Sequence, residues 1–426
     1  MKKIIAILLC VCFIFSLSGA AFASNTVKTG KDNIYLSSAV EEKVTHYPFV
    51  LVHGMMGWGE NAEGVHNSTY WGMMSEETIA DMLREKDYEV AVPTVSPLGS
   101  AWDRACELFA QLTGTVVDYG EAHSKACHHE RYGRDYSGRA LLGENGWDLE
   151  TPINLVSHSF GGPTVSVFAS LMEYGSREEI EASPENCSEL FKGGHPGLVH
   201  SVTTFESPHN GTPAANLLYD TKLPVLFTAI IMNISGTGKK VITDFMFDQY
   251  GITKDPATGE KARFSLAKCI NIAKSKDNCA YDMTLRGARL LNSKFPEAGN
   301  TYYFSVAANM TETGKFGITL PSADKINVLV PTASLVSLMS NLIIDGEYLG
   351  GEWAPNDGLV PVASALYPFG SEHTDYTEGM AVEKGVWNVL PVVTGNHGYA
   401  ISGSAEKLHS IWDALTYRID HINTAQ

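Results

Sequence analysis

The segment Ile153-Asn-Leu-Val-Ser-His-Ser-Phe-Gly-Gly162 constrains the fold more than any other part of this chain. Apolar, β-forming residues lead directly into Ser159, and a helix-like run from Pro163 to Tyr174 follows. A strand that turns sharply into a helix needs small residues around the turn, and it holds the turn side chain above the sheet. Ser157 and Gly161 are the small residues on either side. The pattern predicts a nucleophile elbow with Ser159 at its tip.

Short apolar segments rich in β-forming residues alternate with helical stretches along the chain. The first is Tyr47 to His53, which is apolar on both faces as a buried strand requires, and a helical stretch from Tyr70 to Lys86 follows it. Such alternation predicts a mostly parallel sheet with helices on both faces, the α/β class. Beside the elbow strand, further strands are predicted at 88–95, 199–205, 301–307 and 386–393.

Two stretches interrupt this alternation. Residues 97–147 are rich in His, Gly and Tyr, whereas residues 209–250 form a long apolar stretch. Both are predicted to be insertions between core elements. A chain of 426 residues can bury a large core, and we interpret residues 24–426 as a single α/β domain.

The first 23 residues have the pattern of a secretory signal peptide, which is removed from the mature protein. Lys2 and Lys3 form a basic start, Ile4 to Leu17 an apolar core, and Ala21-Phe-Ala23 a small-x-small cleavage site. No later segment has an uninterrupted apolar run long enough to span a bilayer. We therefore expect a secreted, extracellular protein without a transmembrane anchor.

Charge and cysteine content narrow the classes of partner. The net charge of −17 repels nucleic acid and anionic lipid, which leaves neutral apolar substrates favoured. Of the seven cysteines, Cys10 and Cys12 lie in the signal peptide and five remain. An odd number excludes a fully paired disulfide framework. Cys269 and Cys279 either close a short loop or are buried free thiols.

A serine nucleophile needs a base, and the base needs a carboxylate to orient it. His397 follows a predicted apolar strand, in Val393-Thr-Gly-Asn-His-Gly-Tyr399. The carboxyl ends of parallel strands are where sites in open α/β sheets lie, so His397 is the predicted base. His373, in a polar segment, is the second candidate, whereas His409 and His421 fall in an amphipathic terminal helix and are expected at the surface.

The candidate acid is Asp357 in Asn356-Asp-Gly-Leu-Val-Pro361, a tight turn before an apolar run. Most Asn-Asp-Gly sequences only form an Asx-turn, so the turn by itself does not indicate catalysis. Its place in the chain does, because Ser159, Asp357 and His397 follow the order Ser, Asp, His that α/β-hydrolases use.

An ester-cleaving serine also needs an oxyanion hole, in which two backbone N–H groups stabilise the tetrahedral intermediate. The residue after the nucleophile supplies one donor, here Phe160. The glycine-rich loop after the first strand supplies the other, by position Met55. His53 is then expected to brace this loop rather than to act as a base.

Several motifs resemble those of the secreted lipases of thermophilic bacilli and their staphylococcal relatives. The loop His53-Gly-Met-Met-Gly-Trp-Gly59 is similar to that family's His-Gly-Phe-x-Gly-Trp-Gly, and the long segment Pro97 to Arg134 is the strongest match. The other matching segments are 201–213, 244–251 and 356–361. The resemblance implies an α/β-hydrolase fold, the triad Ser159–Asp357–His397, and a helical lid after Pro208.

The resemblance also implies one structural zinc ion. Carried over by motif, its ligands are Asp103 in Trp-Asp-Arg-Ala, His123 in Tyr-Gly-Glu-Ala-His, His129 before Glu130 to Arg134, and Asp248 in Phe-Asp-Gln-Tyr-Gly. Two imidazoles and two carboxylates can form a closed tetrahedral zinc site. Cys127 lies between the two histidines and is a competing ligand.

The sequence departs from the family at two places. Phe160 stands where the family elbow usually has Gln, a change that keeps the backbone donor. The family's calcium ligands include a Glu two residues beyond the catalytic His and an Asp-Pro shortly after. This chain has Tyr399 and Ser-Gly-Ser-Ala in those places. The calcium site is therefore expected to be absent.

Residues 212–234 contain many apolar side chains and few charges, as in most buried core helices. Because they follow the Ser-Pro-His-Asn-Gly-Thr-Pro turn at a strand's carboxyl end, we interpret them as an amphipathic lid over the active site. We therefore predict a triacylglycerol lipase acting on lipid at a lipid–water interface. The alternatives are a carboxylesterase or polyesterase for shorter or polymeric esters and, less favoured with all three triad residues present, a non-catalytic binding protein of the same fold. A thioesterase or a peptidase fits the apolar lid less well.

Overall fold

The computed structural model describes residues 45–60, 62, 69–221, 246–251, 271–272, 274–322 and 328–423. The predicted signal peptide, residues 1–23, and residues 222–245 of the predicted lid lie outside the described residues. Among the residues that are described, no helix is long and apolar enough to cross a membrane.

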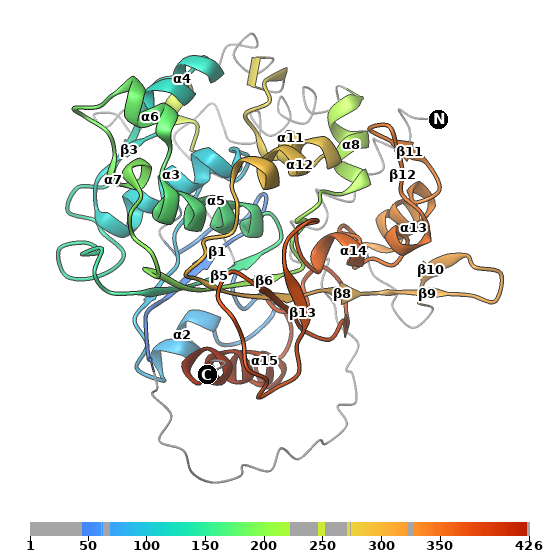
Figure 1. Cartoon of the computed structure of the whole chain (residues 1–426). Helices are drawn as coiled ribbons and strands as arrows, with labels where there is room; N and C mark the ends of the chain where they lie inside the picture. The colour runs from blue at the N-terminus through green and yellow to red at the C-terminus, as the bar shows by residue number, and fades with distance from the viewer. Residues whose placement is uncertain are drawn as a thin grey trace, which may run out of the picture.

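A parallel sheet of seven strands runs through the centre of the molecule (Figure 1). Every pairing between its neighbouring strands is parallel. The predicted α/β class is therefore confirmed, and the arrangement is that of an α/β-hydrolase. In spatial order the strands are β13 (His373–Asp375), β14 (Trp387–Val389), β7 (Tyr302–Val306), β6 (Val199–Phe205), β5 (Ile153–His158), β1 (Phe49–Val52) and β2 (Val90–Ala91).

Helices cover both faces of this sheet, so each strand buries both rows of its side chains. In β1, Val50 and Val52 belong to the core under α3 (Ala101–Thr113) and α5 (Gly161–Tyr174). Phe49 and Leu51, which alternate with them, belong to the core under α2 (Ile79–Arg84) and α15 (Ala405–Asp420). This period of two explains why the strand is apolar throughout, and Figure 1 shows the two helical layers on opposite sides.

The remaining elements lie around this framework. Residues 97–147, predicted to be an insertion, begin with α3, a buried core helix, and continue into an antiparallel pair of short strands. The smaller elements are β3 (Val116–Asp118), α4 (Glu121–Cys127), β4 (Tyr132–Asp135), α6 (Arg177–Ala182), α7 (Glu189–Lys192), α8 (Pro213–Asp220), η2 (Asp248–Tyr250), α11 (Cys279–Asp282), α12 (Leu285–Lys294), β8 (Ala308–Asn309), β9 (Thr311–Thr313), β10 (Thr319–Pro321), α13 (Val330–Met339), β11 (Ile343–Ile344), β12 (Glu347–Tyr348), η3 (Gly351–Trp353), α14 (Val362–Ala365) and β15 (Val393–Thr394).

Several predicted elements differ from the structure. The strands expected over 88–95 and 386–393, for example, are only Val90–Ala91 and Trp387–Val389. The helix expected over 70–86 begins only at Ile79, because Gly72 and Met74 have positive φ angles of 106° and 65° that interrupt a helix. Thr78 caps its N-terminus by accepting a 3.0 Å hydrogen bond from the Asp81 amide. His373, expected in a polar loop, begins the edge strand β13.

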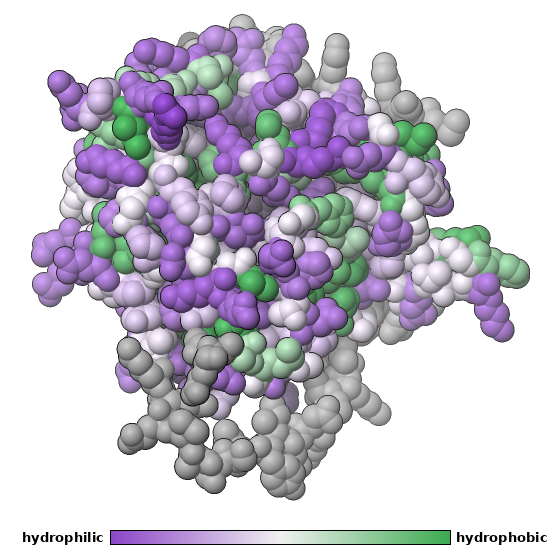
Figure 2. All heavy atoms as spheres, viewed as in Figure 1, coloured by the Kyte–Doolittle hydropathy of each residue, from purple (hydrophilic) through white to green (hydrophobic). Residues whose placement is uncertain are grey.

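The hairpin β9–β10 projects from the body of the protein beside α13 (Figure 1). Its apolar side chains are unusually exposed: Phe316 is 94% exposed, Ile318 57% and Leu320 49%. Figure 2 shows hydrophobic residues gathered at this projection. Such side chains favour contact with another apolar surface over contact with water.

Candidate active site

Ser159 occupies the sharp turn between β5 and α5. Its φ of +55° is a strained value for a residue with a side chain, as expected for the tip of an elbow. The turn requires glycine at 161, because a Cβ there would lie 2.3 Å from the carbonyl oxygen of Val52 and 3.2 Å from Cβ of Ser157. The small side chains predicted around the turn are therefore forced by close packing against β1.

Three side chains from distant parts of the chain form a hydrogen-bonded line. His397 Nε2 lies 2.8 Å from Ser159 Oγ, and His397 Nδ1 lies 2.8 Å from Asp357 Oδ2. All three are buried, with 9% of Ser159, 7% of His397 and 1% of Asp357 exposed. The structure thus brings together the three residues that the sequence suggested as nucleophile, base and acid, in the geometry that proton transfer from serine requires.

Asp357 is held by the turn that surrounds it. Its Oδ1 accepts hydrogen bonds from the amides of Leu359, at 2.9 Å, and Val360, at 2.8 Å. The backbone carbonyl of the same residue accepts from the His397 amide at 2.9 Å. Asp357 therefore both forms an Asx-turn and faces the imidazole, because one carboxylate oxygen accepts from the turn amides and the other lies beside His397.

The surroundings of His397 and His53 shift the pKa values of these two histidines in opposite directions. Burial by itself would lower the pKa of His397, but the Asp357 carboxylate, assisted by Glu206, raises it overall. Burial lowers the pKa of His53 well below its usual value. His53 Nδ1 donates to the Gly54 carbonyl at 2.8 Å, and its Nε2 accepts from the Val95 amide at 3.1 Å. His53 is thus a neutral brace for the loop after β1.

That loop passes directly over the nucleophile. A Cβ added at Gly54 would lie 2.7 Å from Cβ of Ser159, and Met55 lines the same cavity as Ser159. Within the described part of the chain, neither the Met55 nor the Phe160 amide donates a hydrogen bond. Both N–H groups are thus available to a ligand beside Ser159, as the predicted oxyanion hole requires.

A buried arginine fixes the loop. Arg104, with none of its surface exposed, donates to the carbonyl of His53, to that of Ser96 at 3.0 Å, and through Nε to Thr164 Oγ1 at 2.9 Å. Its guanidinium carbon lies 5.2 Å from the centre of the Phe160 ring. Arg104 therefore links the glycine-rich loop to α5 and packs against the residue that follows Ser159.

A second polar group, which the sequence reasoning missed, lies behind His397. His158 Nε2 is 2.8 Å from the His397 carbonyl oxygen and 3.2 Å from Glu206 Oε2, while its Nδ1 is 2.5 Å from the Tyr70 hydroxyl. Glu206 is fully buried, and apart from this contact with His158 its carboxylate oxygens have no hydrogen-bond partner among the described residues. Two features of the sequence could have identified this group. His158 directly precedes Ser159 in the elbow, and Glu206 directly follows β6, at the carboxyl edge of the sheet where active sites lie.

An apolar cavity of ≈ 90 Å³ opens onto Ser159 and His397. Apart from those two residues, His158, Tyr70 and Thr212, its lining is apolar, with no charged Asp, Glu, Lys or Arg among the described residues. Helix α8, within the predicted lid, contributes Ala214, Ala215 and Leu218. The other lining residues are Met55, Met56, Trp58, Met73, Met283, Leu329, Leu359, Val360 and Ile401.

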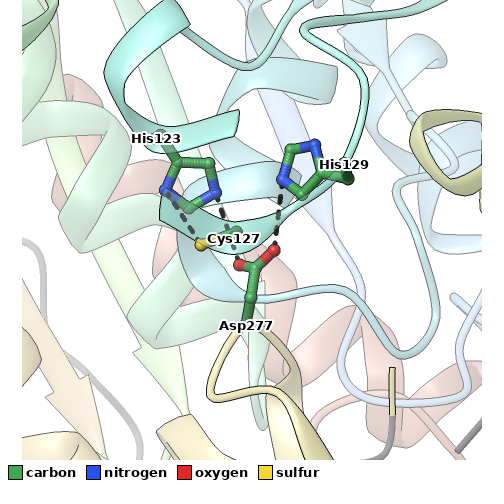
Figure 3. Close-up of side chains that lie close together, drawn as sticks. All are labelled: His123, Cys127, His129 and Asp277. Carbon is green, nitrogen blue, oxygen red and sulfur yellow. Dashed lines mark hydrogen bonds and ion pairs between the residues drawn. The ribbon is translucent and has the colours of Figure 1, made fainter. Parts of the chain in front are cut away.

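A separate group of side chains that could hold a metal ion consists of His123, Cys127, His129 and Asp277, which Figure 3 draws together. Asp103, in the first turn of α3, also lies beside the two histidines. His123 Nε2 is 3.1 Å from Asp103 Oδ1 and 3.4 Å from Asp277 Oδ1. His129 Nε2 is 3.8 Å from Asp103 Oδ1 and 3.3 Å from Asp277 Oδ2. Among the described residues, His129 Nε2 is buried without a hydrogen-bond partner, which fits an atom that binds a metal ion.

These separations fit a tetrahedral ion. Ligand atoms about 2.0–2.1 Å from zinc lie roughly 3.3 Å apart at the corners of a tetrahedron, close to the distances that the two imidazoles and two carboxylates have. Of the other ring nitrogens, only that of His129 makes the outer contact to a backbone carbonyl that is typical of metal-bound histidines. His123 Nδ1 faces Cys127 Sγ at 3.8 Å, and His129 Nδ1 donates to the Glu130 carbonyl at 2.8 Å.

Asp248 differs from its expected position. Its Oδ2 lies 2.8 Å from Arg134 Nη2, and Asp277 is the carboxylate that lies between the two histidines instead. The physical reason is charge pairing, since the Arg134 guanidinium holds the Asp248 carboxylate at the start of η2. The neighbouring Gln249 reaches the cluster, where its Nε2 donates to Asp103 Oδ2 at 2.8 Å. Asp277 carries no sequence motif that would have identified it.

His373, the second candidate for the base, and the two histidines expected at the surface make other contacts. His373 stacks on Tyr367 with ring centres 3.6 Å apart. His409 Nε2 contacts Glu77 at 3.1 Å, and His421 stacks on Tyr417. Cys279 is buried and bonds to no cysteine among the described residues, while Cys269 lies outside them.

Comparison with known proteins gives a consistent result. Residues 45–406 match the family model for the C-terminal domain of lipase-like proteins. Lipase 2 of Staphylococcus aureus is 32% identical over 359 residues, and Lipase 1 of the same species is 35% identical over 347 residues. Those matches cover 83% and 81% of this chain but 50% and 49% of the relatives, so the chain spans about half their length.

Solved structures agree over almost the whole chain. EstA from Clostridium botulinum superposes with a TM-score of 0.76 at 31% identity, covering 97% of this chain and 98% of that protein. The Staphylococcus hyicus lipase superposes with a TM-score of 0.75 at 29% identity, covering 90% and 98%. With an elbow serine, a facing histidine and carboxylate, and these relatives along most of its length, the chain belongs to the lipase-like family whose members include the staphylococcal lipases.

Proposed function

We propose that the protein is a secreted serine ester hydrolase, and specifically a triacylglycerol lipase that forms an acyl-enzyme at Ser159. The observation that carries the proposal is the line of two 2.8 Å hydrogen bonds from Ser159 through His397 to Asp357 at the floor of an apolar cavity. The names of the staphylococcal relatives support a lipase. The signal-peptide pattern of residues 1–23 supports secretion.

In the first half of the proposed reaction, Ser159 Oγ attacks the ester carbonyl carbon while its proton moves to His397 Nε2. The tetrahedral intermediate collapses when the C–O bond to the alcohol breaks, and His397 returns the proton to the leaving alkoxide. In the second half, water attacks the acyl-enzyme and passes a proton to His397, which then protonates Ser159 as the acid leaves. Asp357 stabilises the imidazolium in both halves and does not itself take the proton.

The oxyanion of each tetrahedral intermediate would be bound by the Met55 and Phe160 amides. Loss of one such donor typically lowers the rate by about 10²–10³-fold. Arg104 supports the proposal because it donates to the carbonyls of His53 and of Gly54, the residue before Met55, while packing on the Phe160 ring. One guanidinium thus contacts both the loop that carries Met55 and the side chain of Phe160.

The substrate class follows from the cavity lining and the surface. An uncharged, apolar lining favours a fatty acyl chain, and a net charge of −17 favours neutral lipids over anionic ones. Leu329, which lines the cavity, directly precedes α13, and α13 packs against the hairpin that exposes Phe316. This continuity supports contact with a lipid–water interface, next to the entrance that the predicted lid, residues 209–250, would cover.

We also propose one structural zinc ion bound by Asp103, His123, His129 and Asp277. When bound, zinc would link α3 and α4 to the segment before α11, and four protein ligands would leave no open position for a substrate. The proposal takes Asp277 in place of Asp248, because Asp248 pairs with Arg134. The metal therefore has no step in the ester chemistry.

A serine-directed phosphonate tests the mechanism. Wild-type protein should be labelled at Ser159 and lose activity in step, whereas Ser159→Ala should not be labelled. Substrate class is then read from p-nitrophenyl esters of increasing chain length and from emulsified triacylglycerol. Activity confined to short or polymeric esters would indicate the carboxylesterase or polyesterase alternative, and binding without labelling would indicate a non-catalytic protein. A mature chain recovered from the culture medium that begins at Ser24 would support the predicted cleavage.

A further inference from the structure

Lys407 makes an unusual set of contacts with the loop that carries His397. Its Nζ donates to the carbonyl oxygens of Tyr399, at 2.6 Å, and Ser402, at 2.8 Å. The same nitrogen lies 4.6 Å from the centre of the Tyr399 ring, within the range of a cation–π contact. Lys407 stands in the first turn of α15, so it connects the loop to a core helix.

These contacts concentrate on the segment just after the proposed base. The loop runs from the end of β15 at Thr394 to the N-cap of α15 at Ser404. The lysine stem also packs on this segment, because a Cβ added at Gly403 would lie 3.0 Å from Lys407 Cδ. Charge-assisted hydrogen bonds are about twice as strong as neutral ones. The ammonium therefore holds two turns of the loop in one arrangement.

The opposite end of the loop is held by a different group. The His397 carbonyl is 2.8 Å from His158 Nε2, and His158 in turn lies 3.2 Å from the buried carboxylate of Glu206. Burial lowers the pKa of Lys407, and Glu206 is the group that counters this effect. Glu206 thus lies beside the group that holds the His397 carbonyl and also acts on the ammonium that holds the later part of the loop.

We propose that Lys407 is a positioning residue for the base: its ammonium fixes the Tyr399 and Ser402 carbonyls and so keeps His397 Nε2 in line with Ser159. This inference rests on the proposed function of the triad. On this proposal, the ammonium of a lysine side chain orders the loop that carries His397. A misplacement of about 1 Å at a reacting group can lower a rate by on the order of 10²-fold, so loss of this tie should be measurable in the chemical step.

The test uses the full mature chain with Lys407→Ala and Lys407→Met. The methionine variant keeps an apolar stem over Gly403 and the Tyr399 ring but has no donor. The measured quantity is the second-order rate constant for phosphonylation of Ser159, which reports the nucleophilic step without a contribution from deacylation. We expect both variants to react about tenfold to a hundredfold more slowly than wild type, while Lys407→Arg retains most of the rate.

Propylammonium provides a readout that a general packing defect would not give, because it replaces the atoms that Lys407→Ala removes. Added at millimolar concentration, it should restore a large part of the phosphonylation rate of Lys407→Ala, whereas neutral 1-propanol should not. The matched control is Lys86→Ala, which removes an ion pair to Asp413 on the same helix α15 but touches no part of the loop. This control should react at the wild-type rate with or without propylammonium.

The outcomes separate the inference from the function on which it rests. If wild-type protein is not labelled at Ser159, the proposed mechanism is wrong. If wild type is labelled and Lys407→Met reacts equally fast, the positioning role of Lys407 is wrong. A slow Lys407→Ala that melts at the wild-type temperature but ignores propylammonium would overturn it as well, because packing rather than the ammonium would then explain the loss.

Discussion

Asp357 Oδ2 lies 2.8 Å from His397 Nδ1 while Oδ1 of the same carboxylate accepts two backbone amides of its own turn. The carboxylate therefore cannot rotate without breaking the turn, and the imidazole that it faces is held in the tautomer with a proton on Nδ1. Because this carboxylate is held in place, we expect substitutions in the triad to change activity without changing the fold.

Asp357→Asn is the sharpest of these substitutions. The amide oxygen can still accept from Leu359 and Val360, so the fold should persist, but its NH₂ would face the Nδ1 proton and favour the wrong tautomer. We expect kcat for a p-nitrophenyl ester to fall by on the order of 10⁴-fold. Ser159→Ala and His397→Ala should lose at least as much with an unchanged melting temperature. A variant at Asp357 that stays within tenfold of wild type would contradict the assigned acid.

The acidic limb of the pH profile should depend on Glu206. His397 must be neutral to accept the serine proton, and its pKa is raised above 6.5 by Asp357 with help from Glu206. The value of kcat/KM should therefore fall as the pH drops through that raised pKa. Glu206→Gln removes one group that stabilises the protonated imidazole, so the limb should move to lower pH. A limb that moves to higher pH, or does not move, would count against this electrostatic role.

Metal content should follow Asp277 rather than Asp248. We expect about one zinc per chain by elemental analysis, its loss in His123→Ala and Asp277→Ala, and its retention in Asp248→Ala. Removing zinc with a chelator should lower the melting temperature before it abolishes ester hydrolysis, because a ligand specific to the folded state stabilises that state. If Asp248→Ala loses zinc and Asp277→Ala keeps it, the proposed role of Asp277 is wrong and Asp248, as the family motif implied, is the ligand.

Arg104→Lys should weaken the oxyanion hole selectively. A single ammonium cannot reach the His53 and Ser96 carbonyls and Thr164 together, so the glycine-rich loop should lose its fixed position. Because the oxyanion contacts act mainly in the transition state, kcat should fall roughly 10- to 100-fold with little change in KM. The measurement is steady-state kinetics well below the melting temperature of the variant. A raised KM with normal kcat would instead indicate a defect in substrate binding.

The hairpin β9–β10 should matter only at an interface. Phe316→Ser removes the most exposed aromatic ring of the hairpin, and we expect activity on emulsified triacylglycerol to fall roughly fivefold or more. Hydrolysis of a dissolved short-chain ester should be unchanged. Ile180→Ser, which alters an exposed apolar residue on α6, is the matched control. An equal loss on both substrates would show that the hairpin acts on folding instead of on contact with lipid.

Local sequence was sufficient for the parts of the fold that local physics determines. The elbow could be predicted because a 2.3 Å approach to Val52 leaves only glycine at 161. The strands could be predicted because burial on both faces demands apolar residues at every position, as in β1. The order of Ser159, Asp357 and His397 along the chain pointed to residues that the structure brings within hydrogen-bonding distance.

The contacts that sequence reasoning missed depend on tertiary packing. Asp277 reaches the two metal-site histidines because hydrogen bonds from Cys279 to Leu98 and from Ala101 to Asp282 tie its segment to the start of α3, and nothing in its local sequence indicates a ligand. Glu206 would ordinarily be placed at the surface, yet it is fully buried. The helix expected from Tyr70 lost its first turns to backbone angles at Gly72 and Met74 that its apolar pattern does not reveal.

The parallel sheet also has a consequence for how the protein folds. Phe49 of β1 pairs with Val90 on one side and with Asn154 on the other, and β14 joins β7 across a similarly long separation. Because every such pairing must close a long loop before it gains any hydrogen bonds, folding should be slow and governed by non-local contacts. Ser159 can reach its turn once β1 and β5 have paired, but Asp357 and His397 arrive with the last segments of the chain. A polypeptide that ends before residue 397 would thus contain an elbow without the proposed base, and on the proposed function activity would arise only once β15, which leads to His397, has paired with β8.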